Sequence, residues 1–138
     1  MVFISSIVGD FALPVSSLYC ASKFALNGFI ESLWYELNYL NINVKLILPG
    51  SVESKFWKNS KFVTSTKAEY KEILNKNTQP KKHFFSTKAS TVGRRIYKIA
   101  ISKKNKLSYY VTLDAKIALV TSKILSASLR QKIIKLFF

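Results

Sequence analysis

The chain has 138 residues, of which 49% are hydrophobic and 14% aromatic. This length allows one modest domain with a hydrophobic core but not two, and this composition excludes an intrinsically disordered chain. The single cysteine, Cys20, excludes an internal disulfide and a cysteine zinc site, and no apolar run is long enough to span a membrane. The first residues, MVFISSIVGDF, lack the basic segment of a secretory signal peptide, so a cytoplasmic location is expected.

The net charge of +15 is distributed unevenly along the chain. Residues 1–54 hold two basic and four acidic residues, whereas residues 55–138 hold 20 basic and three acidic ones. Such asymmetry accompanies binding to nucleic acids or anionic membranes. Lysine outnumbers arginine 19 to 3, and arginine is the residue that reads bases and phosphates with paired hydrogen bonds. We therefore expect a solvated, lysine-rich surface and no nucleic-acid partner.

The first elements in chain order are a strand and a long helix. The apolar run 2–4 predicts a short buried strand that ends at the serines that follow it. A helix is expected from Ser16 or Ser17 to about residue 40, because a serine cap precedes apolar residues at helical spacing. The apolar residues that define this predicted face are Ala21, Phe24, Ala25, Phe29, Leu33 and Leu37.

A second strand is predicted over 44–48, after a turn at 41–43 and before a Pro-Gly stop. A strand–helix–strand unit with so long a helix requires the two strands to be parallel. The sequence therefore predicts an α/β fold.

The rest of the chain predicts fewer and weaker elements. Residues 57–88 form a long polar stretch with one helical patch at 68–76. A helix is expected over 89–104, a third strand over 107–112, and a basic amphipathic helix or helix pair over 115–137. The predicted apolar face of the 89–104 helix consists of Val92, Ile96, Ile99 and Ala100.

Tyr19 and Lys23 lie one turn apart at the start of the long helix. A neighbouring cation and the helix N-terminus both favour the phenolate form of a tyrosine, which suits a general acid or base. The spacing alone has low specificity, since seven tyrosines and 19 lysines produce roughly one such pair by chance. An ordinary surface contact is therefore the alternative interpretation of the pair alone.

Four features coincide around this pair. They are a Ser-Ser-x-x-Gly motif after the first strand, a tyrosine thirteen positions beyond the second serine, the Ala-Ser-Lys that follows it, and a Pro-Gly-x-Val-x-Ser motif after the second strand. The segments SSIVGDFALPVSSLYCASKFALNGFIESLWYEL and VKLILPGSVESKF closely resemble the C-terminal catalytic half of the short-chain dehydrogenase/reductase family. The strong resemblance covers residues 1–56, and a weaker one covers the later helix, third strand and tail.

The resemblance implies a single partial domain over residues 1–138. It would form the C-terminal part of a Rossmann-type doubly wound parallel sheet, with about three strands and flanking helices. Residues 1–56 would form the catalytic βαβ unit and residues 57–88 the variable substrate loop. Residues 89–114 would supply a helix and the last strand, and residues 115–138 a basic amphipathic tail.

The resemblance also implies catalytic roles for three residues. Tyr19 would exchange a proton with the carbonyl or alcohol oxygen of the substrate. Lys23 would favour the phenolate of Tyr19 and bind the nicotinamide ribose, and Ser6 would hold the substrate oxygen. Ligands of open parallel sheets bind beyond the carboxyl ends of the strands, where these residues are predicted to lie. Ser5 matches the neighbouring family serine, which is not usually catalytic, and is interpreted as closing the end of the strand.

Cofactor contacts are implied for the loop after the second strand. Its residues that match the family loop beside the nicotinamide of NAD or NADP are Pro49, Gly50, Val52 and Ser54, in addition to Tyr19 and Lys23. Cys20 is interpreted as a small packing residue. No metal site is expected, because His83 is the only histidine and is interpreted as a surface residue.

The four glycines, at positions 9, 28, 50 and 93, are too far apart to form a dinucleotide-binding turn. The family's N-terminal glycine-rich half has no counterpart in the sequence. We therefore expect a catalytic half of an NAD(P)(H)-dependent oxidoreductase that is inactive as this chain alone. The alternative is a non-catalytic remnant that acts as a pairing module or associates with a membrane surface.

Expected partners follow from the same patterns. The substrate would be a small carbonyl or alcohol, and aromatic residues near the variable loop favour an apolar one: Phe56, Trp57, Phe84 and Phe85. The helix over 17–40 is the expected contact in a homo-oligomer. The tail carries Lys123, Arg130, Lys132 and Lys135 among apolar residues, which fits either peripheral membrane contact or a helix packed on the domain.

Overall fold

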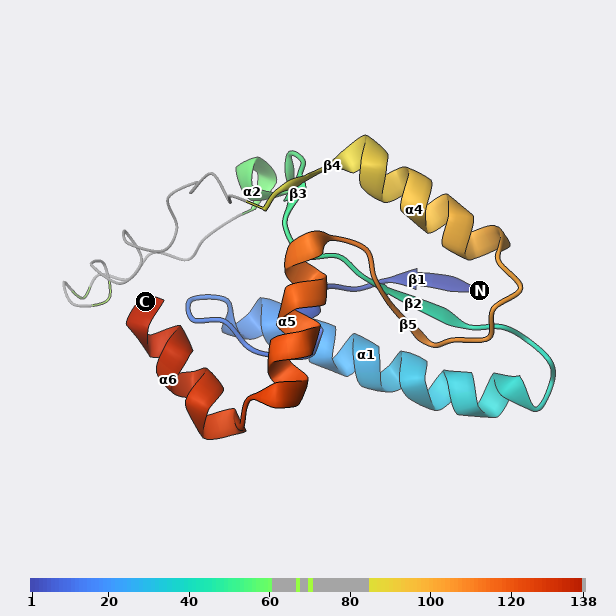
Figure 1. Cartoon of the computed structure of the whole chain (residues 1–138), viewed down its shortest axis with the longest axis horizontal. Helices are drawn as coiled ribbons and strands as arrows, with labels where there is room; N and C mark the ends of the chain where they lie inside the picture. The colour runs from blue at the N-terminus through green and yellow to red at the C-terminus, as the bar shows by residue number, and fades with distance from the viewer. Residues whose placement is uncertain (61–66, 68–69, 71–84, 138) are drawn as a thin grey trace.

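The computed structural model describes residues 1–60, 67, 70 and 85–137. A parallel sheet lies between two helices, α1 on one face and α4 on the other (Figure 1). The elements in chain order are β1 (Val2–Ile4), the 3-10 turn η1 (Ile7–Gly9), α1 (Ser17–Asn38), β2 (Lys45–Leu48), β3 (Val52–Glu53), α2 (Phe56–Asn59), β4 (Thr87–Lys88), α4 (Ala89–Ile101), β5 (Ser108–Tyr110), α5 (Leu113–Ile124) and α6 (Ala127–Phe137).

The main sheet has three strands in the order β1-β2-β5, all parallel. Phe3 of β1 pairs with Leu46 of β2, which in turn pairs with Ser108 of β5. This arrangement confirms the predicted α/β fold and its three parallel strands. A separate short pair, β3 with β4, is also parallel and was not expected from the sequence.

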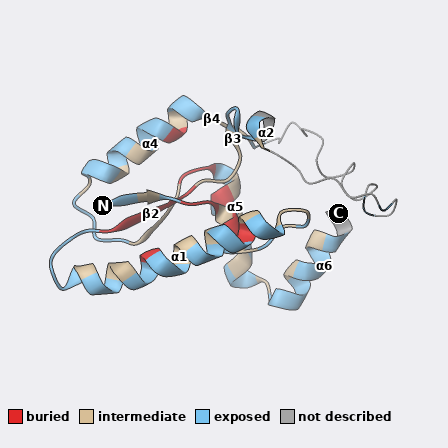
Figure 2. Cartoon of the chain, turned by 180° about the vertical axis from the view of Figure 1, so that it is seen from behind, coloured by how far each residue is buried: buried red, intermediate tan, exposed pale blue. Residues whose placement is uncertain are grey.

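The central strand β2 is buried along its whole length (Figure 2). Leu46 and Leu48 point to the α1 side, where they form one core with Ile30. Ile47 points to the opposite side and packs with Val92 of α4 and other apolar residues. Each face of the sheet therefore has its own small core, as a doubly wound sheet requires.

The apolar face predicted for α1 is wrong in part. Ala21, Phe24, Ala25 and Phe29 are exposed, whereas Leu33 and Leu37 pack against the core as predicted. The buried positions of the helix are Cys20 and Ile30, joined by Leu26, Leu33, Trp34 and Leu37. Apolar residues surround this helix, so spacing alone could not decide which face meets the sheet.

The start of α1 also differs from expectation. Ser16 is the N-cap residue as predicted, but its side chain makes no capping hydrogen bond. Its backbone (φ −131°, ψ 26°) is outside the extended region that capping serines usually adopt. Val15 before it has φ 64°, which is rare for a β-branched residue. The loop that leads to Tyr19 is therefore strained, as loops near functional sites often are.

The later elements match the predictions with shifted ends. The turn after α1 is confirmed, with Asn41 in the left-handed conformation that asparagine tolerates. Helix α4 ends at Ile101, earlier than predicted, and Ala100 is exposed. The tail is a pair of helices, α5 and α6, with residues 125–126 between them. The helical patch predicted at 68–76 and the residues His83 and Phe84 lie outside the described residues, apart from Tyr70.

None of the helices that the structure describes combines the length and hydropathy needed to cross a bilayer.

Lys45 is an unexpected buried cation in β2, with 3% of its surface exposed. Its Nζ donates a hydrogen bond of 2.7 Å to the carbonyl oxygen of Ile99 and another to that of Ser102. These carbonyls belong to the C-terminal end of α4, where the helix dipole also favours a positive charge. Lys45 therefore caps α4 from within the sheet.

Lys45→Met is expected to lower the free energy of unfolding by about 2 kcal/mol, because two hydrogen bonds from a charged group are lost and the partly buried Ser102 carbonyl loses its Lys45 donor. Urea denaturation of the chain measures this change. Lys98→Met is the matched control, since Lys98 is exposed in the last turn of α4. Its substitution should change the free energy of unfolding by less than about 0.5 kcal/mol. Equal effects of the two substitutions would refute the capping role of Lys45.

Candidate active site

The carboxyl ends of β1 and β2 are held together by backbone hydrogen bonds. Ser5 N donates to Ile47 O at 2.9 Å, and Ile7 N donates to Pro49 O at 3.0 Å. Ser6 lies between these two bonds and is 8% exposed. The structure therefore places Ser6 beside the Pro49 loop, at the sheet edge where ligands of parallel sheets bind.

The hydroxyl of Ser6 has a local structural partner. It accepts a hydrogen bond of 3.4 Å from Val8 N and so caps the 3-10 turn η1. A hydroxyl that accepts at its oxygen keeps its proton for another acceptor. Ser5 is also buried, and its hydroxyl has no hydrogen-bond partner among the described residues. The Ser-Ser pair therefore closes β1 and leaves Ser6 chemically usable.

Tyr19 and Lys23 lie together in the first two turns of α1, and both are half-buried. The Lys23 Nζ is 5.6 Å from the centroid of the Tyr19 ring, which is within the range of a cation–π contact. The predicted pairing of phenol and ammonium is therefore present in the structure. The catalytic roles of the two residues stay predictions.

Gly9 allows η1 to approach α1 closely. A β-carbon at this position would lie 2.8 Å from the Lys23 carbonyl oxygen and 2.4 Å from the Asn27 amide nitrogen. Only glycine avoids these collisions. The Gly of the Ser-Ser-x-x-Gly motif thus brings the Ser6 turn against the helix that carries Tyr19 and Lys23.

The loop after β2 is held by the start of α5. Gly50 N donates to the Thr112 hydroxyl at 2.9 Å, and Ser51 N donates to Asp114 Oδ2 at 2.6 Å. A β-carbon on Gly50 would lie 2.3 Å from Asp114 Oδ2. Sequence reasoning missed Thr112 and Asp114 as site residues. Two capping-type side chains at a helix start directly after a strand were the available signal.

A second group of polar residues ties the last strand to the loop after η1. The hydroxyl of Tyr110 donates to Asp10 Oδ2 at 2.5 Å, and Asn27 Nδ2 donates to Asp10 Oδ1 at 3.0 Å. Burial and the Asp10 carboxylate raise the pKa of Tyr110 well above its usual value. Tyr110 therefore stays protonated and acts as a structural donor, unsuited to proton exchange near neutral pH.

The remaining predicted residues lie around this edge. Ser54 is exposed, and its hydroxyl accepts a hydrogen bond of 3.3 Å from Phe56 N, while Val52 lies in β3 and packs on the α4-side core. The ring of Phe56 is 5.6 Å from that of Tyr19, centroid to centroid, so it forms an apolar wall beside the phenol. Cys20 is buried and its sulfur accepts from Leu13 N at 3.5 Å, as its interpretation as a packing residue requires.

Phe85 is exposed, and the side chain of Trp57 lies outside the described part. The described residues contain no cluster of three or more side chains suited to a metal ion. Three predicted catalytic residues therefore lie at one edge, and Phe56, one of the aromatic residues predicted for the substrate, lies beside Tyr19.

The geometry defines the class as a Rossmann-type α/β domain with serine, tyrosine and lysine at the carboxyl edge of its sheet. Comparisons with known proteins agree. A family model described as short chain dehydrogenase matches residues 1–63. The crystal structure of a short-chain dehydrogenase from Streptomyces avermitilis has the same fold, with a TM-score of 0.72 and 21% identity over 97% of this chain and 48% of that one.

Curated relatives are named as oxidoreductases or dehydrogenases. The uncharacterized oxidoreductase YbbO of Escherichia coli (strain K12) is 30% identical over 98% of this chain and 48% of its own length. VdlC of Helicobacter pylori, a probable short-chain type dehydrogenase/reductase, is 30% identical over 91% of this chain and 47% of its own length. Human retinol dehydrogenase 8 is 45% identical over 41% of this chain and 18% of its own length.

The chain is similar to short-chain dehydrogenases/reductases along most of its sequence. It spans about half the length of the curated relatives that it matches along most of its sequence.

Proposed function

We propose that this chain is the catalytic half of an NAD(P)(H)-dependent oxidoreductase that acts on a small carbonyl or alcohol. The contact of Lys23 with Tyr19 at the carboxyl edge of the sheet carries the proposal, together with the turn that brings Ser6 against the same helix. Relatives named as oxidoreductases and dehydrogenases support the reaction class.

The donor set fits the nicotinamide end of a dinucleotide. An ammonium, a phenol and a buried hydroxyl lie at one edge, beside a loop fixed by Thr112 and Asp114. When bound, the nicotinamide would supply or accept the hydride. No cluster of glycines that could cradle the pyrophosphate is present in the sequence.

Each of the three candidate catalytic residues then has a distinct role. Tyr19 would give its phenolic proton to the substrate oxygen during reduction and take a proton back during oxidation. The Lys23 ammonium would stabilise the phenolate that forms, since opposite charges attract strongly in a partly buried site. Ser6 would donate its free proton to the same substrate oxygen and so hold it in place.

The 138-residue chain alone is expected to bind neither NADH nor NADPH tightly, because its residues supply only the nicotinamide end of the site. The affinity is measured by titrating the chain with each cofactor and following the quenching of tryptophan fluorescence and the energy transfer from tryptophan to the bound cofactor. Intact YbbO, a longer relative named as an oxidoreductase, is titrated alongside for comparison. Saturable binding by the isolated chain at micromolar cofactor would contradict this expectation.

A chimera tests the proposed activity itself. Residues 1–138 replace the matched segment of YbbO, which supplies the rest of its own chain. The chimera is expected to bind NAD(P)H and to oxidise it with a panel of aldehydes and ketones. A chimera that folds and binds cofactor but reduces nothing that intact YbbO reduces would count against the proposal.

The alternative, a non-catalytic pairing module, is favoured by one observation. Val2 and Ile4 of the edge strand β1 are 38% and 55% exposed, and β1 pairs only with β2 among the described strands. Such an apolar edge favours pairing with another strand. Sedimentation of the chain with and without Ile4→Lys tests this alternative, since a charged edge should lower association.

A further inference from the structure

The outer face of α5 is a continuous apolar stripe. Its members are spaced four, three and four residues apart, so they lie on one side of the helix. They are Leu113, Ile117, Val120 and Ile124, which are 53%, 45%, 54% and 76% exposed. The opposite side of the helix packs on the domain through Ala115, which is fully buried. The stripe is therefore not part of the core.

The next helix extends this apolar surface. Leu129 and Ile133 lie one turn apart on α6 and are 45% and 37% exposed. Helices α5 and α6 follow one another after a short break, with α5 near the middle of the view and α6 at its lower left (Figure 1). We call the exposed residues of the two helices (113, 117, 120, 124, 129 and 133) the apolar stripe.

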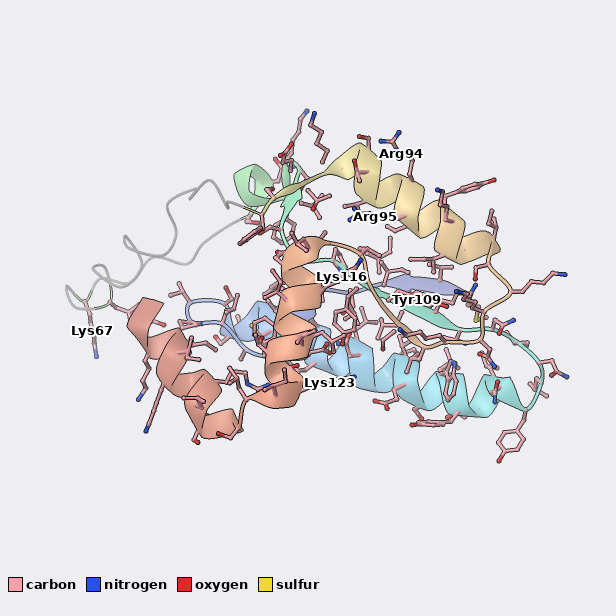
Figure 3. The ribbon with its side chains drawn as sticks, in the orientation of Figure 1. Lys67, Arg94, Arg95, Tyr109, Lys116 and Lys123 are labelled. Atoms are coloured by element: carbon pink, nitrogen blue, oxygen red, sulfur yellow. The ribbon has the colours of Figure 1, made fainter. Side chains whose placement is uncertain are left out.

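The stripe is flanked by positive charge. Residues 113–137 hold five basic residues and one acidic residue. The basic residues are Lys116 and Lys123 on α5, one on each half of the helix (Figure 3), and Arg130, Lys132 and Lys135 on α6. The acidic residue, Asp114, bonds Ser51 N at the domain side. Its charge is therefore directed away from the stripe.

We propose that α5 and α6 dock on an anionic membrane surface through the apolar stripe. Aliphatic side chains enter the interface, and lysines beside them reach the headgroups with their long stems. Helix α5 has 12 residues and is therefore about 18 Å long, too short to cross a hydrocarbon core of about 30 Å. It can only lie in the plane of the interface.

Charge decides between a membrane and a second copy of the chain. Two identical copies that met through this stripe would bring two sets of lysines together, and like charges in contact oppose association. Anionic lipids instead attract each basic side chain by about 1 kcal/mol near the surface. Because α5 begins beside the Gly50–Ser51 loop, docking would also bring the candidate active site close to the lipid.

Flotation of the whole 138-residue chain with vesicles tests the proposal. Vesicles of phosphatidylcholine with phosphatidylserine should bind the chain, and vesicles of phosphatidylcholine alone should bind it far less. The double variant Lys116→Gln/Lys123→Gln should weaken anionic binding roughly 25-fold, from two charges at about five-fold each. The variant Ile117→Ser/Ile124→Ser should abolish binding to both.

Control variants distinguish docking through the apolar stripe from non-specific adsorption and from misfolding. Lys103→Gln/Lys104→Gln removes the same charge from an exposed loop elsewhere, and Ile101→Ser removes an equally exposed isoleucine from α4. Neither should alter binding. The salt dependence of the unmodified chain provides a readout that needs no variant, and binding should fall steeply with salt.

Three results would overturn the proposal: equal binding to neutral and anionic vesicles, equal losses in the control and stripe variants, or self-association through the stripe without vesicle binding.

Discussion

Tyr19→Phe in the YbbO chimera is expected to lower kcat by a factor of about 10² to 10⁴, the usual contribution of general acid–base catalysis. The substitution keeps the ring, whose centroid lies 5.6 Å from that of Phe56 and 5.6 Å from the Lys23 ammonium. It removes only the hydroxyl that would exchange a proton with the substrate. Steady-state oxidation of NAD(P)H measures the effect, and KM for the cofactor should change little.

Tyr35→Phe is the matched control for this prediction. Tyr35 lies on the same helix, is exposed, and donates its hydroxyl proton to Glu31 at 3.4 Å. Its loss should leave kcat unchanged. If the Tyr19 variant retained the activity of the unmodified chimera, another group would have to supply the proton, and the proposed role of Tyr19 would be wrong.

Gly50→Ala is expected to lower the free energy of unfolding by about 3 kcal/mol, at the upper end of the cost of forcing an extra group into a packed site. The cause is steric, since no glycine has a positive φ among the described residues. The added carbon would lie 2.3 Å from the Asp114 carboxylate, which also bonds Ser51 N. Either the loop or the start of α5 must move. Urea denaturation of the chain measures the loss.

A double-mutant cycle assigns this cost to one contact. In the background Asp114→Ala the obstruction is gone, so Gly50→Ala should cost less than half as much. Gly93→Ala is the control. Gly93 is exposed in α4 with open space around it, and alanine there should stabilise the helix by up to about 1 kcal/mol. Equal costs of Gly50→Ala in both backgrounds would exclude the proposed collision.

The parts of the fold that local pattern determines could be predicted. The apolar runs that became β1 and β2, and the uninterrupted helix between them, required a parallel βαβ unit. The burial predicted for the first run was wrong, because β1 is an edge strand and its Val2 and Ile4 are exposed. The buried face of α1 could not be predicted, because both Phe24 and Ile30 fit helical spacing and only the sheet selects one of them. The pairing of β3 with β4 could not be predicted either, because strands of two residues are too short to show a periodic pattern.

The candidate site likewise contains residues that the sequence predicts and contacts that it does not. The places of Ser6, Tyr19 and Lys23 in the fold were predictable because each lies at the end of an element that the pattern defines. Their catalytic roles rest on the family resemblance and stay predictions. Other contacts of the site join residues that are 62 to 100 positions apart in the sequence. They are the bonds from Thr112 and Asp114 to the loop after β2, and the bond from Tyr110 to Asp10. One sequence can mark a capping residue such as Thr112 or Asp114, but it contains no signal for its distant partner. The close approach of Gly9 to α1 is of the same kind, because the collision becomes visible only in three dimensions.

Transfer of deuterium from NADPH labelled at C4 is the most direct test of the proposed function. The YbbO chimera is incubated with [4,4-²H₂]NADPH and an aldehyde that it reduces, and the alcohol is analysed by mass spectrometry. We predict one deuterium on the carbinol carbon, with the hydroxyl proton derived from Tyr19 and ultimately from solvent. An alcohol without carbon-bound deuterium, or no alcohol from a chimera that binds NADPH, would contradict assignment of this chain as the catalytic half of a hydride-transferring oxidoreductase.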